Sequence, residues 1–267
     1  MPNLSVGGKE EEMNVRTWWA AILSGVLLWS AATGAIRAED LRVYSGGAVK
    51  SGLSEAVKLF GEREGIGVAV EFIPMGPLMK RLEDGEVPDV VVLAQGRMET
   101  ALEKRWIVPD TVVDVGRVAM GVAVHKDEPT PDISTPEAFR DLLLQAGSVV
   151  YIDPSIGTSG RHFAKVLERL GIAEEVNAKA VLGTGGYVVA PVGRGEVEVG
   201  IHQITEILPV EGVKMVGPLP PPLGRETLYR GAVMVASARQ EMSRRFLAYL
   251  RSVEVRAMFK ARGFIEE

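Results

Sequence analysis

The sequence contains no cysteine and only three histidines among its 267 residues. Without cysteine, disulfides, thiolate nucleophiles and thiolate metal sites are excluded, so a hydrophobic core has to hold the fold. His125, His162 and His202 are widely separated and lack the spacing that pairs metal ligands on one helix or hairpin. We therefore expect neither a metal nor a cofactor.

Positive charge is also limited, because 30 Lys and Arg are set against 35 Asp and Glu. The net charge of −5 and the lack of a basic run argue against a nucleic-acid partner. Hydrophobic residues make up 46% of the chain and charged residues 24%, which is ordinary for a globular protein. The length is sufficient for two modest domains, each with its own core.

A long hydrophobic run occurs once, at 18–29 (WWAAILSGVLLW). Arg16 precedes it and small residues follow as far as Ala38, which is the pattern of a secretory signal peptide. The run is shorter than the roughly 20 residues of a membrane span, and an uncleaved anchor is the alternative. We predict a signal peptide at 1–38 and a periplasmic or other extracytoplasmic location. Because residues 10–12 are acidic, Met13 is an alternative true start.

Beyond residue 38, apolar strand patterns alternate with helical ones, which predicts an α/β fold with largely parallel sheets. The first unit, 41–60 (LRVYSGGAVKSGLSEAVKLF), reads as a short strand, a turn and an amphipathic helix. The continuous apolar run at 88–93 (PDVVVL) is typical of a strand buried on both faces. The segment 183–195 is ambiguous, because Pro191 and several glycines interrupt it. Further strands are expected at 68–72, 118–124, 148–153, 197–201, 213–216 and 228–237.

Two loops rich in glycine and serine connect a predicted strand to a predicted helix start. The first contains Ser45, Gly46 and Gly47, and the second, 154–160 (PSIGTSG), contains Thr158 and Ser159. Helix starts offer unpaired N–H groups and a positive dipole end, which can hold a small anion. Because ligands of open α/β sheets bind at the carboxyl ends of strands, the pair of loops indicates an anion shared between two blocks. Alternatively, the glycines form only a tight connection and the hydroxyls only cap a helix.

The side chains around the second loop are poorly suited to catalysis. Arg161 adjoins this loop, where it would either meet an anionic ligand or lie in solvent. A hydrolase would use Ser159, His162 and Asp153, but Ser159 and His162 are three apart on one helical turn. No Gly-x-Ser-x-Gly elbow is present. We therefore expect that the protein is not an enzyme.

Over nearly the whole chain after residue 38, the sequence resembles the periplasmic solute-binding proteins of ABC transporters, in the molybdate-binding-protein-like branch. The resemblance is carried, in this order, by LRVYSGGAVKSGL, PDVVVLAQ, GRVAMGVAVHKDEP, DPSIGTSGRHFAKVLERLGI, GRGEVEVGIHQITE and SRRFLAYLRSVEVRAMFKARGF. It implies a two-lobed type II periplasmic-binding-protein fold, in which two crossovers join mainly parallel sheets flanked by helices. We predict lobe one at 39–123 plus 231–267, lobe two at 124–230, and hinge crossings near Val124 and Arg230.

The resemblance also implies ligand-binding positions, several of which carry different side chains here. The two oxyanion-binding serines of the family fall at Ala48 and near Met75, and the tyrosine position falls at Gln203. Backbone contacts fall at Ser159 and at about Gly185. The predicted ligand-binding residues are therefore Ser45, Gly46, Gly47, Ala48, Met75, Gly76, Thr158, Ser159, Gly185 and Gln203.

This set has one polar and one apolar wall, which favours a small organic carboxylate over molybdate or tungstate, since a bare oxyanion needs donors on every side. The sequence thus predicts an exported monomer that captures a small anion between two lobes and delivers it to the permease of an ABC transporter. A secreted ligand sensor that acts on a receptor is the alternative, and a hydrolase is a weaker one.

Overall fold

The computed structural model describes residues 40–265. The predicted signal peptide, 1–38, lies outside the described residues and stays a prediction. In chain order the elements are β1 (Leu41–Ser45), η2 (Gly47–Val49), α1 (Lys50–Glu64), β2 (Val68–Phe72), α2 (Met75–Glu83), β3 (Val90–Ala94), α3 (Gln95–Glu103), η3 (Pro109–Thr111), β4 (Val113–His125), α4 (Pro136–Gln145), β5 (Val149–Ile152), α5 (Thr158–Leu170), α6 (Ala173–Asn177), β6 (Ala180–Gly183), α7 (Ala190–Gly193), β7 (Val199–Gln203), α8 (Ile204–Ile207), β8 (Val213–Pro218), β9 (Glu226–Val233), α9 (Gln240–Leu250) and α10 (Val253–Lys260).

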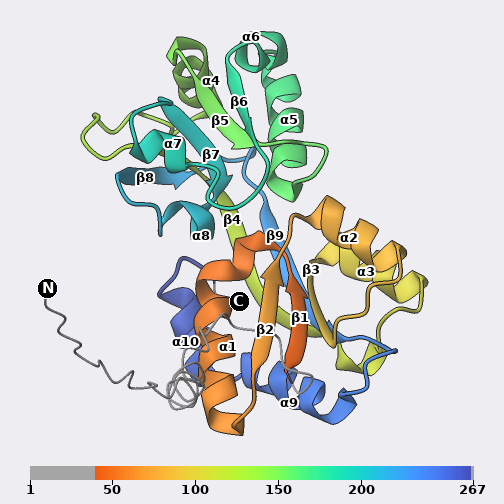
Figure 1. The fold of residues 1–267 in the computed structure, drawn as a ribbon. Coiled ribbons are helices and arrows are strands. Elements are labelled where there is room, and N and C mark those ends of the chain that lie inside the picture. The colour runs from red at the N-terminus through yellow and green to blue at the C-terminus, as the bar shows by residue number, and fades with distance from the viewer. Residues whose placement is uncertain (1–39, 266–267) are drawn as a thin grey trace, which may run out of the picture. The chain divides into compact units, whose positions relative to one another are not determined.

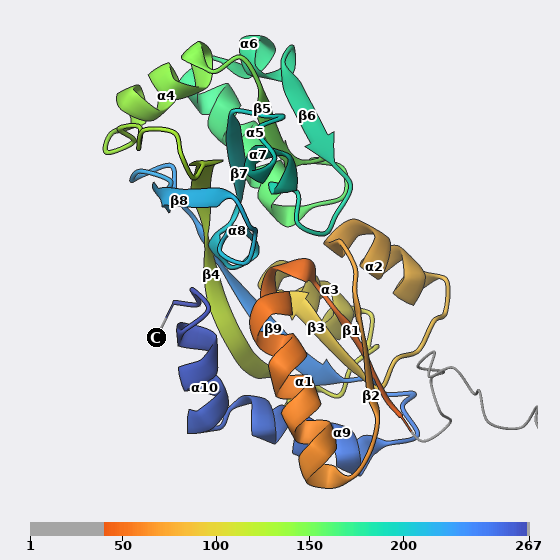
Figure 2. The ribbon, with the colours of Figure 1, turned by 60° about the vertical axis from the view of Figure 1, so that its left-hand side comes forward.

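Two long strands connect two α/β lobes (Figure 1). The strands follow the order β2-β1-β3-β9-β4-β7-β5-β6, and β8 pairs with β4. β1 is parallel to β2 and β3, and β5 is parallel to β6 and β7. β4 and β9 run between these parallel groups and pair antiparallel with their neighbours, as the turned view in Figure 2 also shows. The predicted two-lobed α/β fold with two crossovers is confirmed.

Separate hydrophobic clusters fill the two lobes. The cluster around β1, β3 and β9 contains Phe60 and Phe246, whose ring centroids lie 5.1 Å apart in an edge-to-face contact. A second cluster, around β5 and β7, contains Tyr151 and Phe163 with ring centroids 4.9 Å apart. Since each lobe buries its own aromatic pair, each has the packing expected of an independent core.

β4 belongs to both lobes. Val115 and Val118 lie in the first cluster, whereas Met120, Val122 and Val124 lie in the second. A strand that is shared in this way has no single point of division. The residue boundaries predicted for the lobes, 39–123 plus 231–267 and 124–230, therefore stay a prediction, as do the hinge positions.

Local sequence signals explain several element starts and miss others. α4 begins at Pro136, and Thr135 accepts a hydrogen bond from the Ala138 N–H at 3.1 Å, as the Thr-Pro-Glu pattern predicts. The short elements α6 and β6 carry no pattern that distinguishes them from loop. The ambiguous segment 183–195 forms the last residue of β6, a loop and the single turn of α7. Within residues 40–265, no helix is both long and apolar enough to cross a bilayer.

Gly160 allows the start of α5 to lie against β5. A Cβ atom at this position would lie 2.0 Å from the carbonyl oxygen of Ile152 and 3.0 Å from the backbone nitrogen of Pro154. These neighbours are backbone atoms, so a side chain cannot be accommodated by a change of rotamer. The glycine thus fixes how closely the first turn of α5 approaches the end of β5.

We expect Gly160→Ala to lower the free energy of unfolding by about 1–3 kcal/mol, because the added methyl group overpacks a backbone contact. The matched control is Gly96→Ala in α3, where the added Cβ atom would have no neighbour within 4 Å. Gly96→Ala should stabilise the protein by about 0.5–1 kcal/mol. Urea unfolding followed by circular dichroism compares the two variants; equal stability changes would contradict this account of Gly160.

Candidate functional site

A small cavity lies where strand ends and helix starts of both lobes meet. β1 leads into η2 and α1, β2 leads into α2, and β5 leads through a loop into α5. Figure 2 shows the starts of α1 and α2 in one lobe facing α5 and α8 in the other. The cavity has a volume of about 80 Å³. It is lined by Gly47, Ala48, Lys50, Phe72, Ile73, Pro74, Met75, Ile152, Gly157, Thr158, Ser159, Gly185, Gly186, Tyr187, His202, Gln203, Glu206 and Tyr229.

Most of the predicted ligand-binding residues line this interlobe cavity, namely Gly47, Ala48, Met75, Thr158, Ser159, Gly185 and Gln203. Three do not. Ser45 is fully buried and donates its hydroxyl to the Gly46 carbonyl at 3.1 Å. The N–H group of Gly46 donates to Val92 O, and that of Gly76 to Ile156 O. That the ten residues bind a ligand stays a prediction.

Backbone contacts hold the two lobes together around the cavity. The Gly76 N–H at the start of α2 donates to the Ile156 carbonyl of the other lobe at 3.0 Å. The Thr205 hydroxyl donates to the Ala48 carbonyl at 2.6 Å. Both bonds cross from one lobe to the other, so this arrangement is a closed one.

The start of α5 offers free backbone donors. Gly157 precedes the helix, and no side chain in the described part of the chain caps it. An uncapped first turn leaves N–H groups without partners and places the positive end of the helix dipole beside the cavity. α2 also lacks a side-chain cap from residues 40–265, but its Gly76 N–H donates to Ile156 O and Pro77 has no N–H, so the start of α5 is the better donor site. A carboxylate or another small anion fits such a helix start.

His202 is a buried neutral imidazole whose second nitrogen has no partner. Its Nδ1 accepts a hydrogen bond from the Gln203 N–H at 2.8 Å, so the ring proton is on Nε2. Burial lowers the pKa of His202 to about 4, which keeps the ring neutral near pH 7. Nε2 is buried and finds no hydrogen-bond partner among residues 40–265. It is therefore a donor available to a ligand.

Glu206, on the single turn of α8, lies four residues after His202 at the end of β7 and is also buried in this wall. Burial raises its pKa to about 8, and the positive charge of Lys50 opposes this rise. Its Oε2 lies 3.5 Å from His202 Nδ1, but the two do not form an ion pair, because burial disfavours the charged form of each. Glu206 therefore carries a proton that it can donate near neutral pH and release slightly above it.

Other polar groups complete the wall. Gln203 is 2% exposed, and its Oε1 finds no hydrogen-bond partner within the described residues. The Thr158 hydroxyl lies close enough to Tyr229 to lower the pKa of its phenol slightly. The two hydroxyl groups do not, however, meet the geometry of a hydrogen bond. Burial raises the pKa of Tyr229, so its hydroxyl stays protonated. Buried polar atoms without partners are rare in native proteins, and their concentration here indicates that a ligand satisfies them.

Lys50 supplies the positive charge of the cavity. It is the first residue of α1, and its Nζ lies 5.0 Å from the ring centroid of Tyr187 in the other lobe and 5.8 Å from that of Phe72. These cation–π contacts orient the ammonium group across the cleft. Sequence patterns did not identify Lys50, Tyr187 or Tyr229 as site residues.

His202 and Glu206 were missed for a definite reason. In the sequence, His202 stands out only as a possible metal ligand. The spacing His-x-x-x-Glu, directly after a predicted strand, does not by itself indicate a function. This spacing was the available signal, although His202 lies at the end of β7 and Glu206 on the single turn of α8 that directly follows. No group of three metal-binding side chains occurs in the described part of the chain. The acid–base character of the pair arises from burial, which no sequence pattern states.

The residues considered for a hydrolase are not assembled as one. Ser159 Oγ lies 3.4 Å from His202 Nδ1 rather than near His162. His162 Nε2 lies 2.8 Å from the Leu223 carbonyl oxygen, and Asp153 accepts from the Ser155 N–H at 2.7 Å. His202 Nδ1 already accepts from the Gln203 N–H at a shorter distance, so it is a poor base for Ser159.

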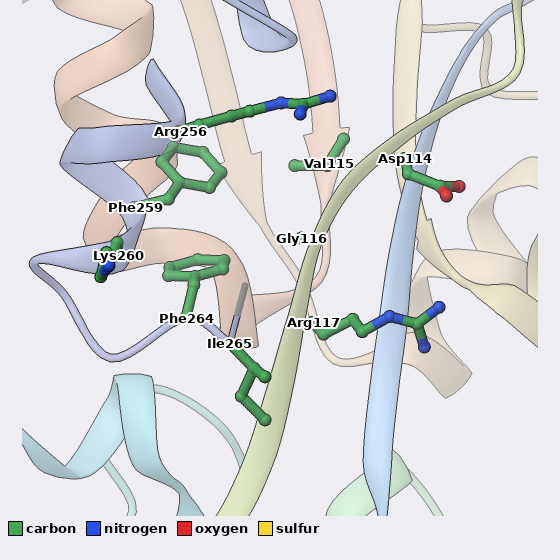
Figure 3. A pocket seen from close by; sticks show the side chains of 9 residues that line it. All are labelled: Asp114, Val115, Gly116, Arg117, Arg256, Phe259, Lys260, Phe264 and Ile265. Atoms are coloured by element: carbon green, nitrogen blue, oxygen red, sulfur yellow. The ribbon is translucent and has the colours of Figure 1, made fainter. Parts of the chain in front are cut away.

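A larger cavity of about 200 Å³ lies away from the cleft, between β4 and α10. Figure 3 shows the rings of Phe259 and Phe264 on one side of it and the side chains of Arg117 and Arg256 around it. The carboxylate of Asp114, at the edge of this cavity, accepts a hydrogen bond from Arg230 Nε at 2.7 Å. Its lining includes neither a buried polar atom that lacks a partner nor a helix start. We therefore assign the functional site to the interlobe cavity.

Two lobes joined by two crossing strands, with a closed cavity at strand ends and helix starts, define a type II periplasmic-binding-protein-like ligand binder. The family model described as bacterial extracellular solute-binding protein matches residues 41–265. The chain belongs to this family, whose members are extracellular and bind a small solute.

Solved structures agree with the fold. The periplasmic molybdate-binding protein of Azotobacter vinelandii superposes with a TM-score of 0.73 at 16% identity, covering 85% of this chain and 99% of that one. A sulfate-binding protein from Mycobacterium tuberculosis gives a TM-score of 0.67 at 16% identity, covering 85% and 86%. The predicted resemblance to the molybdate-binding-protein-like branch is thus confirmed at the level of the fold.

A curated relative corrects one prediction. Aconitate isomerase from a Pseudomonas species is 31% identical over 218 residues, which cover 79% of this chain and 82% of the relative. Because that relative is an isomerase, the prediction that the protein is not an enzyme is wrong. The prediction failed because only a hydrolytic nucleophile was sought, and buried titratable groups such as Glu206 were not considered.

The buried carboxyl of Glu206 makes the free energy of unfolding depend on pH. Between its ordinary pKa of 4.5 and about 8, the folded state holds a proton that the unfolded chain has released, so stability falls as pH rises through this window. Glu206→Gln, which cannot ionise, does not lose stability in this pH window. We expect the variant to match wild type near pH 4.5 and to exceed it at pH 8 by up to about 4 kcal/mol, since one pKa unit corresponds to about 1.4 kcal/mol.

Urea unfolding of wild type and Glu206→Gln at a series of pH values measures the difference. Comparing the two proteins at each pH cancels the contribution of His202, which both retain. The exposed Glu103, changed to Gln, serves as the matched control and should show no pH-dependent gain. A constant difference between wild type and Glu206→Gln across pH 4.5–8 would show that Glu206 is not desolvated.

Proposed function

We propose that the protein binds a small unsaturated carboxylate between its lobes and isomerises it by moving a proton between two carbon atoms. The observation that carries the proposal is the buried Glu206, whose Oε2 lies 3.5 Å from His202 Nδ1, in a cavity wall that also holds the unpartnered Nε2 of His202. The relative named aconitate isomerase supports the reaction class and the ligand class, since aconitate is an unsaturated tricarboxylate.

The proposed step needs one group that can act in turn as base and acid. The Glu206 carboxylate removes a proton from a CH₂ carbon next to a carbon–carbon double bond. The electron pair of the broken C–H bond forms a new double bond, and the former double bond becomes single. Glu206 then returns the same proton to the far carbon of the three-carbon unit. No atom or electron is gained or lost, and rotation about the former double bond permits cis–trans conversion.

The surrounding groups stabilise the negative charge that develops in this step. The His202 Nε2–H donates to a carboxylate oxygen of the ligand while the ring stays neutral, as its low pKa requires. Backbone N–H groups at the start of α5 and the ammonium group of Lys50 hold the same anion. Fixed donors in a water-poor cavity are effective because they need no reorganisation. A pKa of about 8 on Glu206 suits both proton removal and return near neutral pH.

The walls of the cavity favour an organic anion over a tetrahedral oxyanion. Ala48, Pro74 and Met75 form an apolar side, whereas Thr158 and Gln203 lie on the polar side. A carbon skeleton can pack against the apolar side, and Met is adaptable in such contacts. Molybdate or sulfate would leave that side without donors. The solved neighbours named for these ions share the fold at 16% identity, which does not extend to ligand choice.

Capture of the ligand for transport is a second candidate function, and membership of a solute-binding family favours it. In this proposal an exported protein, directed by the segment 1–38, closes on its anion and presents it to a membrane permease. Closure would occur by hinge movement at the crossings near Val124 and Arg230 between the two predicted lobes. The interlobe hydrogen bonds of Gly76 and Thr205 are those that such a hinge would make and break.

Glu206→Gln is the decisive variant for the isomerase proposal. We expect it to reduce the rate of cis–trans conversion of aconitate by at least about 1,000-fold, because Gln can neither accept nor return the proton. Binding of propane-1,2,3-tricarboxylate, the saturated analogue, should persist within about tenfold, because Gln can still donate a hydrogen bond. Proton NMR follows the conversion, and titration calorimetry follows the binding.

In wild type, kcat/KM should rise with pH and level off above about 8, as the free enzyme gains the ionised base. Glu103→Gln is the matched control and should retain full activity. Full activity of Glu206→Gln would overturn the proposed role of the carboxyl. Absence of any conversion by wild type, with the saturated analogue still bound, would favour the transport candidate.

Substitution of Thr205, whose hydroxyl donates to the Ala48 carbonyl of the other lobe, tests whether closure of the lobes contributes to ligand binding. Thr205→Val leaves the Ala48 carbonyl without its donor from the other lobe, so we expect affinity for propane-1,2,3-tricarboxylate to fall by about threefold to tenfold. Thr205→Ser keeps the hydroxyl and serves as the control, with affinity close to wild type. Small-angle scattering should show compaction of wild type by the ligand; an unchanged radius of gyration, with ligand bound, would contradict closure.

A further inference from the structure

A second cavity shares a wall with the interlobe cavity. It has a volume of about 130 Å³, and Thr158, Ser159 and Gln203 line both cavities. The two cavities therefore adjoin at these three residues. The unpartnered Oε1 of the buried Gln203 side chain belongs to this shared wall. β4 and the start of β9, which cross between the lobes, contribute Met120 and Thr227 to the second cavity.

Three cationic side chains line this second cavity, namely Arg161, Lys165 and Arg225, and we call it the cationic cavity. No carboxylate in the described part of the chain forms an ion pair with any of them. Other arginines, such as Arg81 with Glu71 at 2.8 Å and Arg230 with Asp114 at 2.7 Å, do form ion pairs. Arg161 is half-buried and Lys165 and Arg225 are exposed, so together they make a positively charged rim that attracts an anion.

A further cation approaches from the other lobe. Burial lowers the pKa of Arg161, and the positive charge of Arg97 on α3 lowers it further. Arg97 also lacks an ion pair with any carboxylate among residues 40–265. The two guanidinium groups therefore repel each other across the cleft, and an anion between the lobes would remove this repulsion.

The volume of the interlobe cavity is too small for a whole polycarboxylate. An ordered water needs about 10–15 Å³ of such volume, so a cavity of about 80 Å³ takes roughly six atoms of that size. A tricarboxylate has about twice as many non-hydrogen atoms. The cationic cavity adds about 130 Å³ next to it, at the shared residues Thr158, Ser159 and Gln203. A tricarboxylate, the ligand class proposed above, thus needs the additional volume of this second cavity.

We propose that the cationic cavity is a subsite for a second carboxylate of the ligand whose reacting part lies in the interlobe cavity. This inference rests on the proposed function and specifies its substrate class as a di- or tricarboxylate rather than a monocarboxylate. Arginine suits the role because its planar fork matches a carboxylate with two hydrogen bonds. Arg161 then determines specificity without taking part in proton transfer.

The test compares carboxylates of different charge on wild type, Arg161→Gln and the double variant Arg161→Gln/Arg225→Gln. The probes are propane-1,2,3-tricarboxylate, glutarate and butyrate, titrated by ligand-induced shifts in the protein NMR spectrum. The exposed Arg251, changed to Gln, is the matched control because it directly follows α9, outside both cavities. Thermal unfolding of each variant shows whether it remains folded, and Arg161→Lys provides a variant that keeps the charge.

We expect the double variant to lose affinity for the tricarboxylate by about 10- to 100-fold, since charge-assisted hydrogen bonds are lost, and to change butyrate affinity less than about twofold. Salt should weaken the tricarboxylate complex of wild type more than that of the variant. An equal loss for all three probes, or no loss for any, would overturn the subsite while wild-type binding left the proposed function intact. If wild type bound no carboxylate, the proposed function would fail and the subsite with it.

Discussion

The burial of Glu206 is the constraint on which the rest of the site depends. A carboxyl group that is removed from water holds its proton up to a higher pH, which brings the pKa of Glu206 to about 8, close to neutral pH. Its neighbour His202 is neutral for the same reason, so the cavity wall presents donors instead of charges. The burial itself requires both lobes, because Gly47 of the opposite lobe lies directly against the carboxyl: a Cβ atom there would be 2.8 Å from Oε1.

Backbone atoms make much of the contact between the lobes, which explains how side chains at the site can change while the fold is kept. The Gly76 N–H and the carbonyls of Ile156 and Ala48 take part in the interlobe hydrogen bonds whatever their side chains are. Ala48 and Met75 occupy positions where the resemblance implies serine. The same framework can therefore present an apolar wall in one protein and a complete shell of donors in another.

This separation of framework and chemistry accounts for the different names among the similar proteins. Structures named for molybdate and sulfate share the lobes and the crossing strands at 16% sequence identity, whereas a relative at 31% identity is an isomerase. A cleft that closes on an anion already excludes water and positions donors. One buried group of suitable pKa is then enough to add proton transfer to binding.

The sequence by itself determined the alternation of strands and helices and the two loops at Ser45–Gly47 and Thr158–Ser159, because apolar periodicity and glycine positions are local properties. The two lobes followed from the resemblance to the solute-binding family. The sequence did not reveal that burial keeps Glu206 and His202 neutral near pH 7, or that Lys50 reaches across the cleft to Tyr187. Their protonation and contacts depend on desolvation by residues that are distant in the chain, and only the closed tertiary structure brings those residues together.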